Sequence, residues 1–213
     1  MDKHIIHILI LLIVITITNG CSNKCISFDD EYIKMYMLEH HDRDGDKCIS
    51  DVEASYVNEI PDNAFNVKEQ FGNIHDESEF KNLPCPSSLN DLNKFPNLTT
   101  IGERAFFYCA KLESVKLDYV KSVRKDAFKL CQNIKEIVMP NLTKIGNGAF
   151  VTKGELKRVE FTTIYTIETE KYVFTGGYCP DVLVLKKNKE PSVNEGSIPW
   201  IDKDACKEIR YVE

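Results

Sequence analysis

Apolar residues recur at intervals of 22 through the middle of this 213-residue chain. Three copies carry the pairs Ala105-Phe106, Ala127-Phe128 and Ala149-Phe150, and Tyr172 holds the aromatic position of a fourth. A period of this length is typical of solenoids, in which each unit buries its apolar edge against its neighbours. The other columns are Leu98, Val120, Leu142 and Ile164; Ile101, Val123, Ile145 and Ile167; Leu112, Ile134 and Leu156; Val115, Ile137 and Val159; Leu117, Met139 and Phe161.

Within one copy the apolar residues lie at strand spacing. Val115 and Leu117 are two residues apart, and Pro140 directly follows a similar run, where a strand must end. Each copy is therefore predicted to consist of short strands joined by turns.

The array has weaker copies at both ends. Residues 60–65 repeat the spacing from an isoleucine to an Ala-Phe pair, 41 residues before the first regular copy, and are interpreted as a broken copy. After Phe174, an insertion of two residues would bring Leu183 into the column of Val159. Trp200 and residues 209–212 are expected to cap the last coil, because the end repeats of solenoids are atypical.

A helix–loop–helix is predicted ahead of the repeats. Ser50, with Glu53 three residues later, is the capping-box pattern of a helix start, and Pro61 is expected to end this second helix. Its expected apolar face is Val52, Tyr56 and Ile60. The expected face of the first helix is Phe28, Tyr32, Met35, Tyr36 and Glu39.

Carboxylates stand at positions one, three, five and twelve of the loop between these helices. Ca²⁺ takes six to eight oxygen ligands, and a loop with this spacing supplies them from one short turn. The last carboxylate is expected to give two oxygens. The predicted ligands are Asp42, Asp44, Asp46, Cys48 through its backbone carbonyl, Ser50 directly or through water, and Glu53.

Two departures lower the expected affinity. Lys47 stands at the sixth position, where such loops carry glycine, and a side chain in a left-handed turn costs about 1–2 kcal/mol. The sequence contains no recognisable second loop to pair with the first. Affinity near that of extracellular modules, about 10⁻⁴–10⁻³ M, is expected. The alternative is a loop held by its cap and helices without metal.

The first twenty residues are predicted to be an export signal. Lys3 precedes the nearly unbroken apolar run 5–17, which is shorter than the roughly twenty residues that span a bilayer. The Gly20-Cys21 step resembles the cleavage and lipidation site of bacterial lipoproteins, which implies that Cys21 is acylated. Thr18 stands where those sites prefer an aliphatic residue, so secretion without lipid and an uncleaved anchor stay open.

Charge is unevenly distributed along the chain. The whole sequence has 33 acidic and 27 basic residues; residues 21–96 carry 16 acidic and 7 basic, and residues 97–174 carry 9 and 13. Neither part has the dense basic stripe of a nucleic-acid-binding protein. The predicted parts are a signal peptide (1–20), a helix–loop–helix head (21–66), a linker or N-terminal cap (67–96), the repeats (97–174) and a C-terminal repeat with its cap (175–213).

Eight cysteines in an exported chain favour disulfides. Cys109 and Cys131 share one column of the repeat and lie within bridging range, but small buried thiols in an apolar ladder are the favoured state. The spacing of the remaining cysteines determines no pairing and forms no metal knuckle.

The repeat Leu98-x-x-Ile101-Gly-x-x-Ala105-Phe106-x-x-Cys109-x-x-Leu112-x-x-Val115 resembles the BspA-like leucine-rich repeat family. The acidic loop resembles a single EF-hand, or dockerin-like, calcium loop, with Ile49 at the position that packs between the helices. The combination is identified as an α+β protein: a short leucine-rich-repeat solenoid, rich in strands and of about four coils, behind an EF-hand-like module. The resemblance implies secretion or surface display, with adhesion to host or matrix proteins.

No catalytic constellation is recognisable around the three histidines after residue 20, which are His40, His41 and His75. The predicted function is therefore a non-enzymatic binding scaffold with one structural calcium. Its partner would be a protein or matrix ligand on the repeat surface, where Lys116, Lys121 and Arg124 are the residues to test. Nucleic acid is not expected, and membrane contact only through a lipid anchor at Cys21 in the outer membrane. A purely structural envelope protein and a dockerin-like assembly module are the alternatives.

Overall fold

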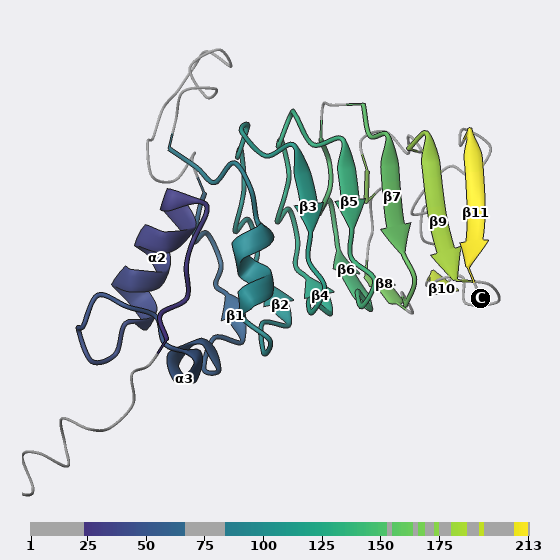
Figure 1. The fold of residues 1–213 in the computed structure, drawn as a ribbon. Helices are drawn as coiled ribbons and strands as arrows, with labels where there is room; N and C mark the ends of the chain where they lie inside the picture. The colour runs from purple at the N-terminus through teal and green to yellow at the C-terminus, as the bar shows by residue number, and fades with distance from the viewer. Residues whose placement is uncertain are drawn as a thin grey trace, which may run out of the picture.

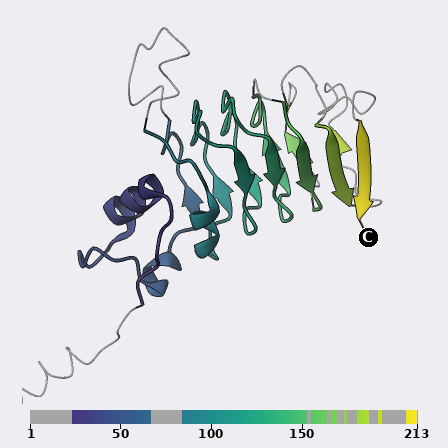
Figure 2. The ribbon, with the colours of Figure 1, turned by 45° about the horizontal axis from the view of Figure 1, so that its top comes forward.

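The computed structural model describes residues 24–66, 84–152, 155–163, 166–168, 173–174, 180–186, 192–193 and 207–212. Within this part, a small helical head leads into a solenoid whose coils follow one another along one axis to β11 (Figures 1 and 2). One continuous apolar core runs from Ile33 in the head to Leu185 near the far end. The repeat pattern of the sequence is thus realised as a single packed column.

The first sheet has six strands, all parallel, in the order β1-β2-β4-β6-β8-β10. Its inward column of Ile60, Ile101, Val123 and Ile145 is buried completely or almost so. The strands are β1 Glu59–Ile60, β2 Thr100–Ile101, β4 Ser122–Val123, β6 Lys144–Gly146, β8 Thr166–Glu168 and β10 Ser192–Val193.

The second sheet has five parallel strands in the order β11-β9-β7-β5-β3. Val115 pairs with Ile137 and Ile137 with Val159, one period apart at each step. The strands are β3 Ser114–Lys116, β5 Glu136–Val138, β7 Arg158–Phe161, β9 Val182–Lys186 and β11 Glu208–Val212. The sheets run past the four regular coils that the sequence predicts, because the irregular copies at the ends pair as well.

A column of phenylalanine rings fills the interior between the sheets. Phe65, Phe106, Phe128 and Phe150 stack in succession with centroids 5.0, 5.2 and 5.3 Å apart and ring planes within 7° of parallel. Their backbones form a ladder too, since each of the first three N–H groups donates to the alanine of the next coil. Residues 60–65 are therefore confirmed as the first copy of the repeat.

The two-residue insertion lies earlier than the sequence suggests. Leu183 pairs with Val159 as predicted. However, Phe174 already pairs with Phe150, 24 residues away, and stacks on it at 6.0 Å. The aromatic position of the fourth copy is therefore Phe174 and not Tyr172, and the insertion lies between β8 and Phe174.

The head contains helix α2 (Glu31–His41) and the one-turn helix α3 (Asp51–Ala54). Two predictions are wrong here. The buried face of α2 is Ile33 and Met37; of the predicted face, Met35 is 59% exposed and only Tyr36 on the helix packs against the core. Helix α3 stops far short of Pro61, because Glu59–Ile60 extends into β1 and pairs with β2.

Two buried carboxylates join the head to the solenoid. Asp30 caps α2 through one oxygen and accepts N–H bonds from Ser87 and Ser88 with the other. Asp91, in the short 3₁₀ helix η1 (Asn90–Lys94), accepts the N–H groups of Asp29 and Asp30 at 2.8 Å each. The segment after residue 84 is therefore bonded to the start of α2.

Candidate functional site

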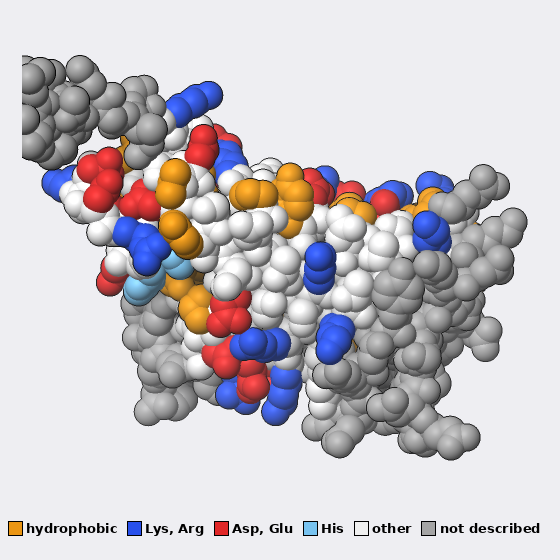
Figure 3. Space-filling view, turned by 90° about the horizontal axis from the view of Figure 1, so that it is seen from below, with side chains coloured by type: hydrophobic (Ala, Val, Ile, Leu, Met, Phe, Trp, Pro, Cys, Tyr) orange, Lys and Arg blue, Asp and Glu red, His pale blue; other side chains and the backbone are white. Residues whose placement is uncertain are grey.

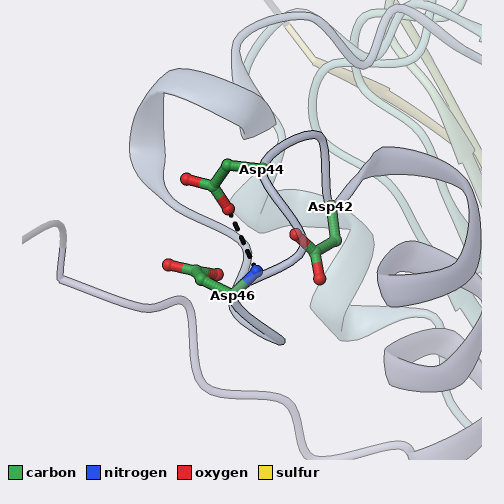
Figure 4. Close-up of side chains that lie close together, drawn as sticks. All are labelled: Asp42, Asp44 and Asp46. Atoms are coloured by element: carbon green, nitrogen blue, oxygen red, sulfur yellow. Dashed lines mark hydrogen bonds between the residues drawn. The ribbon is translucent and has the colours of Figure 1, made fainter.

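The acidic loop brings three of its predicted ligands together. Carboxylate oxygens of Asp42, Asp44 and Asp46 lie within 4.8 Å of one another at the surface of the head (Figure 4). Two ligands of one Ca²⁺ ion, each 2.3–2.6 Å from it, are at most about 5 Å apart. The three aspartates are therefore close enough to share one ion.

Hydrogen bonds to the loop backbone hold these side chains. Asp42 accepts the N–H groups of Gly45 at 2.8 Å and Lys47 at 2.9 Å, and Asp44 accepts that of Asp46 at 3.2 Å. Lys47 has φ = 64°, so the sixth position adopts the left-handed turn that such loops require. The chain makes this turn with a lysine.

Glu53 does not join the three aspartates. One of its oxygens accepts the Arg43 N–H at 2.7 Å, and the other accepts both the N–H and the hydroxyl of Ser50 at 2.9 Å. The predicted capping box is present, because the Glu53 N–H donates to the Ser50 hydroxyl in return. Ser50 and Glu53 thus hold the two ends of the loop together, and both carboxylate oxygens of Glu53 accept hydrogen bonds within the loop.

An N-terminal segment pairs with the loop where an EF-hand normally meets a second loop. Cys25 forms an antiparallel bridge with Ser50, and the Ile26 N–H donates to the Ile49 carbonyl at 2.8 Å. A disulfide joins Cys25 to Cys48, the seventh loop residue. This pairing is not predictable from the sequence, since two cysteines 23 residues apart carry no signature of their own.

The carboxylates of the loop repel one another. Partial loss of solvent is the main reason that the pKa of Asp46 is raised above its ordinary value. The N–H of Cys48 opposes this shift, and the charges of Asp44 and Asp42 add to it. A bound cation would offset the repulsion among these carboxylates, which fits the hard oxygen donors that Ca²⁺ prefers.

The repeat surface carries ion pairs that step from coil to coil. On the second sheet, Lys116 lies 2.7 Å from Glu136, and Arg158 lies 3.8 Å from the same glutamate. Arg124 binds Glu59 and Asp62, each at 3.2 Å. Because Lys116 is on β3 whereas Lys121 and Arg124 flank β4, the three predicted contact residues do not share one face.

A cavity of about 460 Å³ opens between the head and the first coil. Tyr36, His41 and Tyr56 contribute to its lining. Burial, followed by the charge of His40, lowers the pKa of His41 below its ordinary value. Figure 3 shows histidine side chains beside hydrophobic ones on this face, next to a group of mixed charges.

The predicted signal peptide, Cys21, His75 and Trp200 lie outside the described residues. Within the described part, no helix is long and apolar enough to cross a membrane. Cys109 and Cys131 are free and completely buried, which confirms the prediction of buried thiols.

The sequence profile of the BspA type leucine rich repeat region matches residues 50–179 in six copies, more than half of the chain. The protein therefore belongs to the BspA-type leucine-rich repeat family. The match begins at Ser50, within the head, in agreement with the pairing of β1 and β2. No curated protein and no solved structure matches the chain significantly.

Proposed function

We propose that this protein is an exported scaffold that binds a protein or matrix ligand through its repeat surface, in the manner of an adhesin. The observation that carries the proposal is the parallel ladder. In each sheet, neighbouring strands come from successive coils, so their outward side chains lie side by side on one surface. These side chains can vary while the buried columns keep the fold. Repeat membership in the BspA-type family supports the same role.

The first sheet offers the surface with the least internally paired charge. Lys121 and Lys125 flank β4, both are exposed, and neither has a charged partner within the described part of the chain. On the second sheet the charges of Lys116, Glu136 and Arg158 already pair with one another. A ligand with acidic groups would therefore bind at β4 without first breaking an ion pair.

The binding test uses the full chain immobilised against a panel of extracellular matrix and cell-surface proteins. For any ligand found, we expect the double change Lys121→Glu and Lys125→Glu to weaken binding at least tenfold. The matched control is Lys157→Glu on the second sheet, where Lys157 already pairs with Glu155 at 3.1 Å and Asp181 at 3.3 Å. Equal binding by all variants would show that β4 is not the contact surface.

We also propose that one calcium ion stiffens the head. The three aspartate oxygens, the left-handed turn at Lys47 and the second chain segment against the loop all support this proposal. The ion would supply positive charge that locks the loop; Asp42, Asp44 and Asp46 would hold it, and Glu53 would hold the loop ends. A structural role fits because the disulfide already limits opening of the loop.

Calcium binding is tested by thermal melts of the full chain in millimolar calcium and in chelator. At tenfold excess over Kd, a site specific to the folded state stabilises by about 1.4 kcal/mol. Asp44→Asn with Asp46→Asn should remove the shift, whereas Asp118→Asn, at an exposed position on the solenoid, should keep it. The absence of any calcium-dependent shift in the unaltered chain would refute the site.

Export and anchoring at Cys21 complete the proposal. Mass spectrometry of the mature N-terminal peptide distinguishes the three outcomes directly. A diacylglyceryl-modified Cys21 supports the lipid anchor, an unmodified N-terminus near residue 21 supports plain secretion, and an intact Met1 peptide would overturn cleavage.

A further inference from the structure

The cavity between the head and the first coil takes no part in the scaffold function proposed above. Its volume of about 460 Å³ lies within the range of about 300–1,000 Å³ that is typical of small-molecule sites. One wall comes from the C-terminal half of α2, and the other comes from the segment that leads from α3 into β1. Its lining includes Tyr36, His40, His41, Tyr56, Asn58 and Glu59.

The walls of the cavity are held in place by contacts within the chain. The Tyr36 ring contacts the rings of His40 and Phe65, whose centroids lie 4.4 and 4.7 Å from its own. Asn58 is fixed through its backbone, because its carbonyl accepts the N–H of Thr99 at 2.9 Å. Walls that are already ordered lose little conformational freedom when a ligand binds.

The carboxylate in the lining is already balanced by a positive charge. Glu59 binds Arg124 at 3.2 Å, and the guanidinium of Arg43 lies 4.4 Å from the centroid of the Tyr56 ring. A cationic ligand would compete with these two arginines for the carboxylate and the ring, and an anionic ligand would meet the charge of Glu59. The lining therefore favours an uncharged ligand.

Two polar groups of the lining are ready to bind such a ligand. The Nε2 atom of His41 is buried and has no hydrogen-bond partner among the residues that the structure describes. Burial, followed by the charges of Glu39 and Glu59, raises the pKa of Tyr36 to about 12, so its hydroxyl stays protonated and can donate. Because buried polar atoms in folded proteins are nearly always hydrogen-bonded, an unpaired Nε2 atom in a cavity wall indicates a place for a partner.

We infer that this cavity binds a neutral pyranose sugar, either free or as the end residue of a glycan. A pyranose presents C–H groups on its ring faces, and these groups pack on aromatic rings. Its hydroxyl groups lie around the edge, where each can donate and accept hydrogen bonds. The rings of Tyr36 and Tyr56 provide the aromatic surface, and Tyr56 is 60% exposed.

The polar groups of the lining match the edge of a sugar ring. A hydroxyl group can donate to Glu59 without displacing Arg124, whose hydrogen bond goes to Oε2 of the two carboxylate oxygens. Other hydroxyl groups suit the side-chain amide of Asn58 and the Nε2 atom of His41, which a hydroxyl matches in either tautomer of the ring. None of the lining residues lies on β4, so sugar binding does not depend on the repeat surface proposed above.

Saturation-transfer NMR with the full chain tests the inference. The probes are the methyl pyranosides of glucose, galactose, mannose and N-acetylglucosamine, each beside its free sugar, with choline chloride as the cationic alternative. We expect irradiation of the aromatic protons of the protein to saturate the C–H protons of one or more of these sugars. A signal from both forms of a sugar assigns the site to the end residue of a glycan, and a signal from the free form alone assigns it to free sugar.

Two pairs of variants locate the site. Tyr56→Ala should weaken binding about tenfold, whereas Tyr119→Ala, which removes a 43% exposed tyrosine from the solenoid, should not. Glu59→Gln and Asp62→Asn each remove one partner of Arg124, at 3.2 Å in both cases, but of the two only Glu59 lines the cavity. Glu59→Gln should therefore weaken binding about tenfold, and Asp62→Asn should leave it unchanged.

Three results would overturn the inference. The first is the absence of saturation transfer to every sugar of the panel, and the second is transfer to choline in place of the sugars. The third is a bound sugar whose affinity is the same in Tyr56→Ala and Glu59→Gln as in their two controls. Circular dichroism of each variant, recorded before the binding measurement, verifies that the fold is kept.

Discussion

The acidic loop and the phenylalanine column show two ways of holding a chain in place. In the solenoid the same contact recurs from coil to coil, with rings about 5 Å apart between Phe65 and Phe150. In the loop each contact occurs once, and nearly all are hydrogen bonds from backbone N–H groups to carboxylates such as Asp42 and Glu53. One region is held by repetition and the other by individual polar bonds.

This difference decides which region responds to its surroundings. The stability of stacked apolar rings depends on area removed from water, which neither pH nor calcium changes. A loop held by ionised side chains loses its bonds when they are protonated and gains stability when a cation binds. Sensitivity to acid and to ions should therefore reside in the head, and the solenoid should respond mainly to cavities.

The largest expected effect is a break in the aromatic column. Phe128 is completely buried between Phe106 and Phe150, so Phe128→Ala should cost about 3–5 kcal/mol in the free energy of unfolding. Urea denaturation followed by circular dichroism measures the loss. The control is Phe107→Ala, because Phe107 is partly exposed and contacts Tyr108 edge-on. Similar losses in both variants would contradict the special role of the column.

The next effect concerns the head alone. Cys25→Ser with Cys48→Ser opens a loop whose ends are 23 residues apart, which should cost about 2–4 kcal/mol by the loop-closure argument. We expect faster hydrogen exchange in residues 24–60, with little change at β5 and β7. Exchange that increases equally along the whole chain would show that head and solenoid unfold as one unit.

Much of the solenoid could be predicted because every coil must bury apolar residues at the same positions. The column of Ile101, Val123 and Ile145 repeats, so an error in one copy is corrected by the next. The position of the insertion could not be predicted, because Tyr172 and Phe174 are both aromatic and the apolar pattern between β8 and β9 suits either alignment.

Features that occur only once were harder to predict. Spacing along the chain identified the three aspartates and the capping box, since the chemistry is local. The strand at Cys25–Ile26 is too short for a periodic signal, so its pairing with Ile49 was not recognisable. Ile60 fitted both the helical spacing after Ser50 and the first repeat copy, and long-range pairing with Ile101 decided for the strand.

A smaller effect, dependent on pH, is expected at Glu53. Hydrogen bonds from the N–H groups of Ser50 first and then Arg43 lower its pKa below the ordinary value of 4.5. As the pH falls, the unfolded chain therefore takes up the proton first, and the stability that Glu53 provides at neutral pH is lost as the pH passes its lowered pKa. Glu53→Gln should cost about 1–2 kcal/mol at pH 7 and less at pH 3.

Urea unfolding at the two pH values measures this difference for Glu53→Gln and for Glu113→Gln. Glu113 is exposed and directly precedes β3, so its variant should match the unaltered chain at both pH values. A Glu53→Gln penalty that stays constant between pH 7 and pH 3 would contradict the role of the ionised carboxylate. The loss would then come from the poorer fit of the amide group to the hydrogen-bond donors.

The smallest expected effect concerns the left-handed turn. Lys47→Gly removes a side chain from a residue with φ = 64°, which relieves about 1–2 kcal/mol of strain but gives the unfolded chain about 0.5–1 kcal/mol of extra freedom. The net result should lie between no change and a gain of about 1.5 kcal/mol in the free energy of unfolding. Lys121 is exposed and is not one of the residues with positive φ, so Lys121→Gly relieves no strain. It only increases the freedom of the unfolded chain and should be destabilising. Glycine at position 47 keeps the backbone N–H that donates to Asp42. A difference between Lys47→Gly and Lys121→Gly therefore reports backbone strain and not the loss of a hydrogen bond. Equal losses in both would show that the loop accommodates its lysine without strain.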